Sequence, residues 1–162
     1  VPMLPANLLL QTADGKPRYM NYESLAEGGF ETGTMMGSGG FIVLDEEQDI
    51  VYHTYTISRF YRHESCGQCS PCREGTHWLE KILKRMVDGH GQMKDIDLLW
   101  SVQGNIEGNT ICPLGDAAAW PVASVIRHFR EEFEWRVNMG VEGVGKKYGL
   151  GNSADPIKVN ND

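Results

Sequence analysis

The stretch "ESCGQCSPCREG", residues 64–75, carries three cysteines at intervals of three residues. They are Cys66, Cys69 and Cys72, and the chain has one other cysteine, Cys112. A disulfide between neighbours in this stretch would close a very small ring, which gains little loop entropy and strains the bond. Because the sequence shows no recognisable secretory signal, we expect these crowded thiols to serve metal or redox chemistry.

The spacing of the thiols favours an iron–sulfur cluster. Three cysteines at i, i+3 and i+6 can direct their sulfurs toward one point around a compact turn, and Gly67 and Pro71 suit such a turn. A [4Fe–4S] cube needs four terminal ligands, and a remote Cys-Pro pair, as in "GNTICPLGD" at 108–116, can supply the fourth. Such closed coordination indicates electron transfer. The predicted metal ligands are Cys66, Cys69, Cys72 and Cys112.

A zinc site is the alternative. Zinc accepts four thiolates, but its usual pattern is two CxxC pairs rather than one loop of three and a remote cysteine. His63 or His77 could replace a thiol as ligand. In that case the chain would be a non-redox assembly module held together by zinc.

Composition excludes several classes of protein. The formal net charge is -7 over 162 residues, and no dense basic stripe offsets it, so we expect no nucleic-acid partner. No apolar run approaches the roughly 18 residues of a membrane span, so we expect no direct membrane insertion. The chain opens on Val1 rather than Met, and we expect it to be part of a longer protein.

Three zones differ in their sequence pattern. Residues 1–48 carry short β-like runs separated by glycines, and "FIVL" at 41–44 is the best candidate for a buried strand. Residues 49–138 show the spacing of four amphipathic helices, which predicts a small bundle. Residues 139–162 are rich in Gly and Asn, which predicts a flexible, mostly irregular tail.

Several features of the helical zone can be predicted individually. Asp49 is expected to cap the first helix and Gly89 to end the second, while the last helix is expected to run from Asp116 through Phe133. Core packing is expected for three tryptophans: Trp78, Trp100 and Trp120.

Four segments resemble a known family. "ESCGQCSPCREGT", "GNTICPLGDAAAWPV" and "IRHFREEFE" are similar to the C-terminal part of the NADH-oxidising flavoprotein subunit of respiratory complex I (the family of NADH-quinone oxidoreductase F subunits). "MGSGGFIVLDEE" is similar to the β-grasp-like SLBB module that precedes the cluster domain there. The resemblance covers residues 1–136. It implies an α+β fold, with an SLBB module followed by a four-helix bundle that binds a [4Fe–4S] cluster through the four cysteines named above.

The resemblance also implies a function. In this family the cluster takes electrons from FMN, which NADH reduces, and passes them to the next cluster of an NADH:quinone oxidoreductase. FMN and NADH bind in an N-terminal domain that has no counterpart in this chain, so we expect no activity from the chain alone and predict no catalytic residue. The implied partners are that flavin domain and other subunits of the peripheral arm, on the cytoplasmic side of the inner membrane.

Related subunits of NAD-linked formate dehydrogenases or hydrogenases are an alternative to complex I. Some of those carry a further cysteine-containing segment after the helical domain, and residues 139–162 have no cysteine, which favours complex I. Arg73, beside the cysteine loop, could offset the negative charge of the cluster or could simply be a solvated charge at a helix start.

Overall fold

The computed structural model describes residues 3–5, 16, 40, 42–45 and 47–147. Within these ranges the chain forms helices joined by short connections and contains no strand. The helices are α4 (Ile50–Glu64), α5 (Ser70–Val87), α6 (Met93–Ile106), α7 (Leu114–His128) and α8 (Arg130–Lys147). No helix in the described ranges is both long and apolar enough to cross a membrane.

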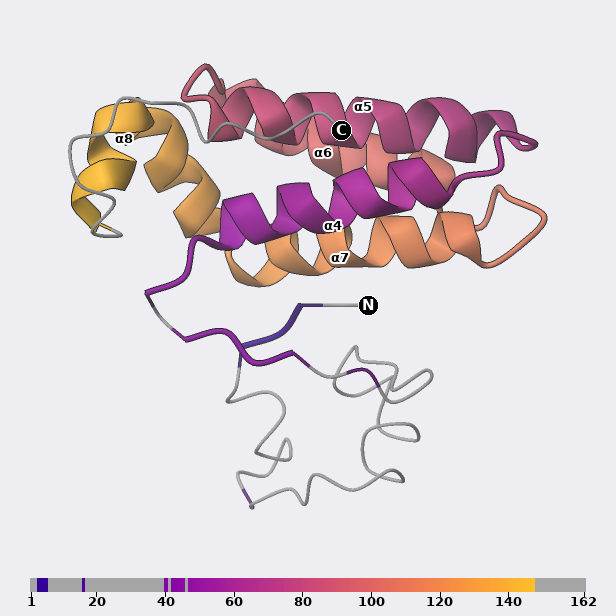
Figure 1. Ribbon diagram of the computed structural model, residues 1–162, viewed down its shortest axis with the longest axis horizontal. Helices are drawn as coiled ribbons and strands as arrows, with labels where there is room; N and C mark the ends of the chain where they lie inside the picture. Colours follow the sequence, from indigo (N-terminus) through magenta and orange to yellow (C-terminus); the bar gives the residue numbers. More distant parts are fainter. Residues whose placement is uncertain (1–2, 6–15, 17–39, 41, 46, 148–162) are drawn as a thin grey trace.

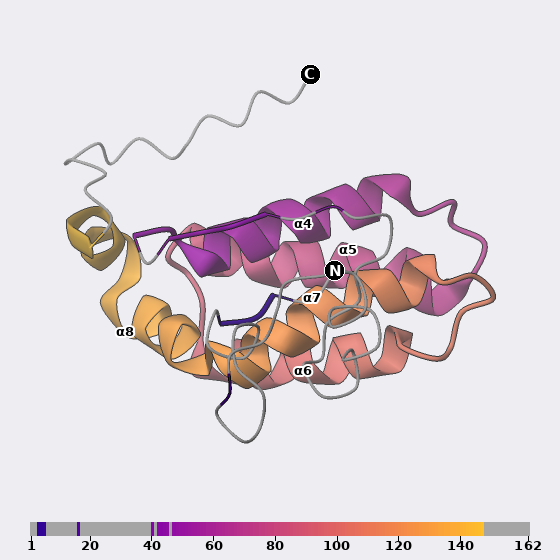
Figure 2. The ribbon, with the colours of Figure 1, turned by 90° about the horizontal axis from the view of Figure 1, so that it is seen from below.

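The helices α4 to α7 form an antiparallel four-helix bundle. Each of them packs against two neighbours: α4 and α6 both contact α5 and α7 (Figure 1). The fifth helix, α8, lies at one end of the bundle, where it contacts all four others (Figures 1 and 2). The predicted helical bundle is therefore confirmed, and the described residues form one helix more than the sequence indicated.

The predicted α+β fold class is wrong for the part of the chain that the structure describes. The candidate strand at 41–44 has no partner strand among the described residues, and the side chains of Ile42 and Val43 are 81% and 78% exposed. β-Branched residues favour a strand only where neighbouring strands pair with it and a core covers one face. Most of the predicted SLBB module at 1–48 lies outside the described residues.

The core forms where the apolar faces of the helices meet. Within each helix the buried residues are three or four positions apart, as in an amphipathic helix that packs on one side. Full burial of each such side chain contributes about 1.5–3 kcal/mol to folding. The largest members, all at most 1% exposed, are Val51, Leu79, Leu83, Met86, Ile96, Leu99, Ile106, Val122, Val125 and Phe133. Phe133 comes from α8, so this helix contributes to the core as well as covering the end.

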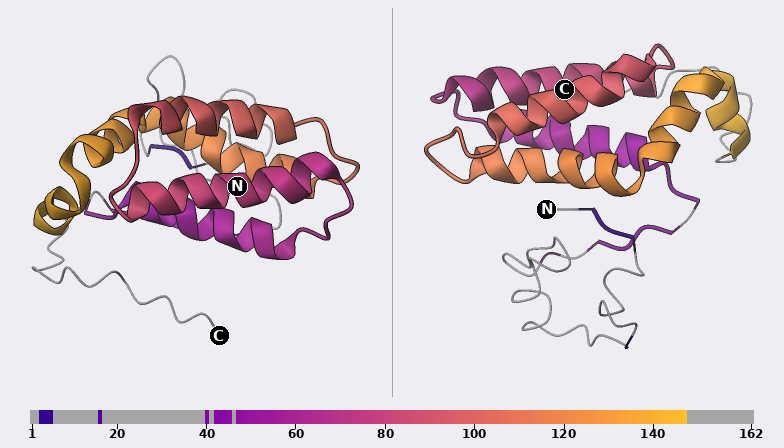
Figure 3. Two further views of the ribbon diagram at one scale, coloured as in Figure 1. Left: turned by 90° about the horizontal axis from the view of Figure 1, so that it is seen from above. Right: turned by 180° about the vertical axis from the view of Figure 1, so that it is seen from behind.

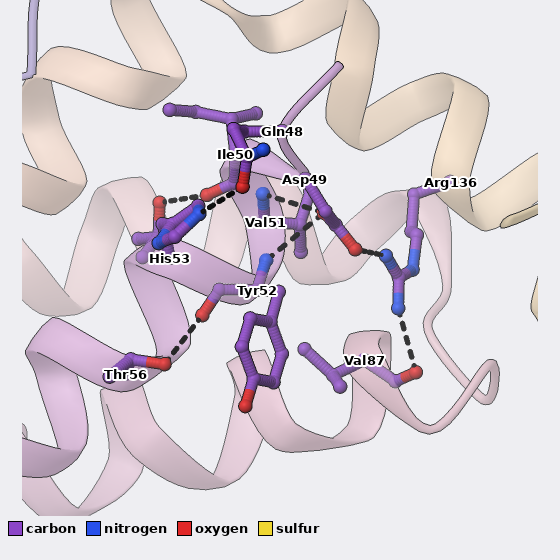
Figure 4. Close-up of polar contacts among 10 residues, drawn as sticks. Gln48, Asp49, Ile50, Val51, Tyr52, His53, Thr56, Val87 and Arg136 are labelled. Carbon is purple, nitrogen blue, oxygen red and sulfur yellow. Dashed lines mark hydrogen bonds and ion pairs between the residues drawn. The ribbon is translucent and has the colours of Figure 1, made fainter. Parts of the chain in front are cut away.

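A buried ion pair joins three helices at the end occupied by α8. Asp49 caps α4, since its Oδ1 accepts hydrogen bonds from the N–H groups of Val51 at 3.0 Å and Tyr52 at 3.1 Å. Its Oδ2 pairs with Nη1 of Arg136 on α8, and Nη2 of Arg136 donates to the carbonyl of Val87 at 2.9 Å, where α5 ends (Figure 4). The cap predicted at Asp49 is confirmed, and the same carboxylate fixes α8 against α4 and α5.

Two other predictions about helix ends have different outcomes. Gly89 has a φ of +81°, which suits the residue that follows a helix end, and α5 ends just before it. The single last helix predicted from Asp116 to Phe133 is wrong. The backbone leaves helical geometry at Phe129, with φ -131° and ψ 27°, and two helices result.

The prediction that three tryptophans pack in the core is wrong for two of them. Trp78 and Trp100 are 53% and 43% exposed, and Trp120 is half-buried. Trp100 lies on the bundle surface with the guanidinium of Arg127 5.8 Å from its ring centre, a cation–π contact that needs an exposed ring face.

The proposed division of the chain at 48/49 and 138/139 stays a prediction, although α8 continues to Lys147 around a break at Gly140.

Candidate metal centre

The bundle topology brings the two cysteine-bearing segments together. In an antiparallel bundle the first and third connections lie at the same end. The α4–α5 connection carries Cys66 and Cys69, and the α6–α7 connection carries Cys112. Both connections lie at the end of the bundle opposite α8, as every view of the ribbon shows (Figures 1 to 3).

All four cysteines line one pocket at this end. Its volume is about 150 Å³, and the other residues around it are Glu64, Ser65, Gln68, Thr110 and Leu114. This volume is several times the roughly 30 Å³ that one water molecule occupies in the liquid. Within the described ranges, no three His, Cys, Asp or Glu side chains are grouped closely enough to hold a single ion. The four thiols line this one pocket together, and thiolates are the donors that hold iron–sulfur clusters.

The four thiols differ in exposure. Cys72, in the first turn of α5, is buried, whereas Cys69 is half-buried and Cys66 and Cys112 are exposed. A centre held by these residues would face the core on one side and the end of the bundle on the other.

The first loop is held by hydrogen bonds around a left-handed glycine. Gly67 has a φ of +78°, a conformation that side-chain-bearing residues rarely adopt. Its N–H donates to the hydroxyl oxygen of Ser65 at 3.3 Å, and its carbonyl accepts from Nη1 of Arg73 at 2.8 Å. The expected role of Gly67 as a turn residue is confirmed.

Two polar groups contact the cysteine sulfurs. The hydroxyl of Ser65 lies 3.2 Å from Sγ of Cys72, and the N–H of Ile111 donates to Sγ of Cys69 at 3.5 Å. The second contact crosses from the α6–α7 connection to the α4–α5 connection. A cysteine sulfur bound to a metal carries no proton and can accept such hydrogen bonds.

Arg73 is exposed to solvent, and its guanidinium also makes hydrogen bonds to the first loop. Besides Gly67, its guanidinium donates to the Ser70 hydroxyl at 3.3 Å and to the Glu74 carboxylate at 2.9 Å. Its aliphatic chain packs beside Gly67, where a Cβ would lie 3.7 Å from Cδ of Arg73. Its positive charge therefore lies beside the cysteine loop with a defined position.

The second loop is closed by Asp116, in the first turn of α7. Its Oδ1 accepts from the N–H of Gly108 at 2.7 Å, which joins the two ends of the connection. Within the loop, the Thr110 hydroxyl donates to the carbonyl of Cys112 at 2.9 Å. The sequence indicated Asp116 only as the start of the last helix, and its contact with Gly108 depends on the geometry of the loop.

The histidines weighed as alternative ligands lie elsewhere. His63 is exposed, and its Nδ1 lies 2.9 Å from the carboxylate of Glu64, while His77 is half-buried on α5. Neither is among the described residues that line the cysteine pocket. Burial raises the pKa of Tyr61, which lies one turn before Ser65.

Comparison with known proteins identifies the family. The region described as "NADH-ubiquinone oxidoreductase-F iron-sulfur binding region" matches residues 53–136, which include all four cysteines. The F subunit of the NADH-quinone oxidoreductase of Rickettsia bellii is 48% identical over 137 residues, which cover 85% of this chain and 30% of the relative. The F 1 subunit of the same enzyme in Rhizobium meliloti is 45% identical over 138 residues, with the same coverage of 85% and 30%.

Solved structures give a consistent result. The crystal structure of an NAD+-reducing [NiFe]-hydrogenase in the H2-reduced state is 33% identical, with a TM-score of 0.56, over 59% of this chain and 17% of that chain. The chain spans about 30% of the length of the curated relatives that it matches. The chain belongs to the family of iron–sulfur binding regions of the NADH-ubiquinone oxidoreductase F subunit, and corresponds to part of that subunit.

Proposed function

We propose that this chain holds one [4Fe–4S] cluster through Cys66, Cys69, Cys72 and Cys112 and relays electrons in an NADH:quinone oxidoreductase. The observation that carries this proposal is the pocket of about 150 Å³ that all four cysteines line. When bound, the cluster supplies a site that accepts and returns one electron at a time. Four thiolate ligands leave no iron open to a substrate, which suits transfer without bond chemistry.

The protein's own residues would set the surroundings of the cluster. Ser65 and the backbone of Ile111 offer hydrogen bonds to two of the sulfurs. Arg73 is fixed against Gly67 and supplies a positive charge beside the loop. Donors and positive charge both stabilise the additional electron that a reduced cluster carries.

The source and the destination of the electrons follow from the family. We propose that the electrons come from FMN, reduced by NADH in a flavin domain outside this chain, and pass to the next cluster in the peripheral arm. Partners would then be the flavin domain and other arm subunits, on the cytoplasmic side of the inner membrane. Support comes from relatives named as NADH-quinone oxidoreductase subunits.

A second candidate function is the same relay in an NAD+-reducing hydrogenase or a related formate dehydrogenase. It is supported by the likeness to the NAD+-reducing [NiFe]-hydrogenase at 33% identity. The 48% identity to the F subunit of an NADH-quinone oxidoreductase covers more of the chain and favours the first candidate. A zinc-stabilised assembly module is the non-redox alternative.

Substitution of each predicted ligand tests the proposal. Cys112→Ala removes the remote ligand, so we expect the variant to lose iron and the electron paramagnetic resonance (EPR) signal that appears on reduction. His63→Ala and His77→Ala serve as controls and should retain both. Wild-type iron content in Cys112→Ala, or loss of the metal from a histidine variant, would contradict the ligand set.

A further inference from the structure

The hydroxyl of Ser65 lies between a donor and a sulfur. Its oxygen accepts the N–H of Gly67 at 3.3 Å and lies 3.2 Å from Sγ of Cys72. Ser65 follows the last residue of α4, and its own N–H is bonded to the carbonyls of Tyr61 at 3.1 Å and Arg62 at 3.4 Å. The hydroxyl is thus held in place by the end of one helix and by the loop that leads to the next.

The chemistry of the sulfur decides which partner donates. In a free thiol either group could give the proton. A cysteine bound to metal is a thiolate with no proton, so it can only accept. Because the N–H of Gly67 already points at the Ser65 oxygen, the hydroxyl proton is free to turn toward Cys72.

Burial strengthens this contact. The side chain of Cys72 is 7% exposed, so few waters compete for its sulfur. A hydrogen bond to a charged group in such low-dielectric surroundings is stronger than the same bond in water. Cys66 and Cys112 are exposed, where solvent can solvate the sulfur in place of the protein.

We propose that Ser65 is a positioning residue that acts through Cys72 and raises the reduction potential of the bound cluster. The reduced cluster carries one more negative charge, spread in part over its thiolate ligands, and the hydroxyl stabilises that charge. This inference rests on the proposed function, because it needs a cluster held by Cys72. The inference assigns to Ser65 an effect on the reduction potential that the four cysteine ligands alone do not account for.

The test is an EPR-monitored potentiometric titration of the 162-residue chain, its Ser65→Ala variant and two further variants. We expect Ser65→Ala to lower the midpoint potential, because the hydrogen bond is stronger to the more negative reduced cluster than to the oxidised one. Since only that difference shifts the potential, the ratio of reduced to oxidised cluster at a fixed ambient potential should fall by roughly threefold. Ser65→Thr retains a hydroxyl and should restore the wild-type potential. Ser70→Ala is the matched control, because that exposed hydroxyl lies at the start of α5 and accepts only one bond from Arg73, which keeps its bonds to Gly67 and Glu74.

Iron content separates this inference from the proposed function. Wild-type chain without iron would refute the relay itself. With iron present in all four proteins, an unchanged potential in Ser65→Ala, or an equal fall in Ser70→Ala, would overturn the role of Ser65. Loss of iron from Ser65→Ala but not from Ser65→Thr would also overturn it, because the hydroxyl would then be needed for assembly rather than for the potential.

Discussion

Replacing Asp49 with asparagine isolates the charge of the buried ion pair from the helix cap. Asparagine caps a helix about as well as aspartate, so the hydrogen bonds from Val51 and Tyr52 can persist. The substitution removes the negative charge that faces Arg136, whose side chain is 5% exposed (Figure 4). The guanidinium then keeps the carbonyl of Val87 as acceptor but has no counter-charge.

The expected loss of stability follows from this geometry. Breaking a buried pair by removing one partner costs about 3–5 kcal/mol, and we expect about 3 kcal/mol because Arg136 keeps its bond to the carbonyl of Val87. Arg136→Met should cost about 2 kcal/mol, since Asp49 then keeps its two N–H donors. The double variant should lose about 2–3 kcal/mol rather than the sum of about 5, because neither charge is left alone.

Urea unfolding followed by far-ultraviolet circular dichroism measures these losses, with every protein in the same metal state. The coupling energy from the double-mutant cycle is the decisive quantity. A loss below about 1 kcal/mol in Asp49→Asn, or additivity within about 0.5 kcal/mol, would show that the pair does not fix α8 to the bundle.

Three further predictions concern packing, loop geometry and pH. Gly75→Ala should destabilise the chain by about 1–3 kcal/mol in urea unfolding, because the new Cβ would lie 2.5 Å from Cγ1 of Ile106. Gly104→Ala is the control: its new Cβ would have no neighbouring atom within 4 Å, and it should stabilise the chain by up to about 1 kcal/mol. Gly67→Ala forces a residue with a Cβ to a φ of +78°, so iron retention during dialysis against a chelator should fall, and full retention would count against the loop geometry. Burial and, to a lesser extent, the guanidinium of Arg127 lower the pKa of His128 in the folded chain. The unfolded chain therefore binds a proton more readily than the folded chain, and stability should fall as pH drops below about 6.5. His128→Gln should flatten this dependence in urea midpoints measured from pH 7 to 5, and an unchanged slope would refute it.

The grouping of the cysteines was predictable because it depends on spacing and on short connections. Two helices with a short turn must run antiparallel, so Cys112 returns to the end that carries Cys66 and Cys69. The buried faces of the helices were also predictable, since their apolar residues recur every three or four positions along the sequence. These features depend only on the order and period of residue types.

Features that depend on exact backbone angles could not be predicted. The contact between Ser65 and Cys72 occurs beside Gly67 in its left-handed conformation, and the pattern of residue types contains no signal for a hydroxyl's direction. The break at Phe129 follows no Gly or Pro, and the apolar period continues across it to Phe133. The exposed Trp78 shows a further limit, because a large apolar ring at the edge of a helix face can lie outside the core.

Metal analysis of the chain purified without oxygen tests the central claim most directly. Iron, zinc and acid-labile sulfide would be measured together on the same sample. The account predicts about four irons and a matching amount of sulfide per chain, as a closed [4Fe–4S] cluster requires. About one zinc per chain with negligible iron would contradict it and would favour a zinc-stabilised assembly module.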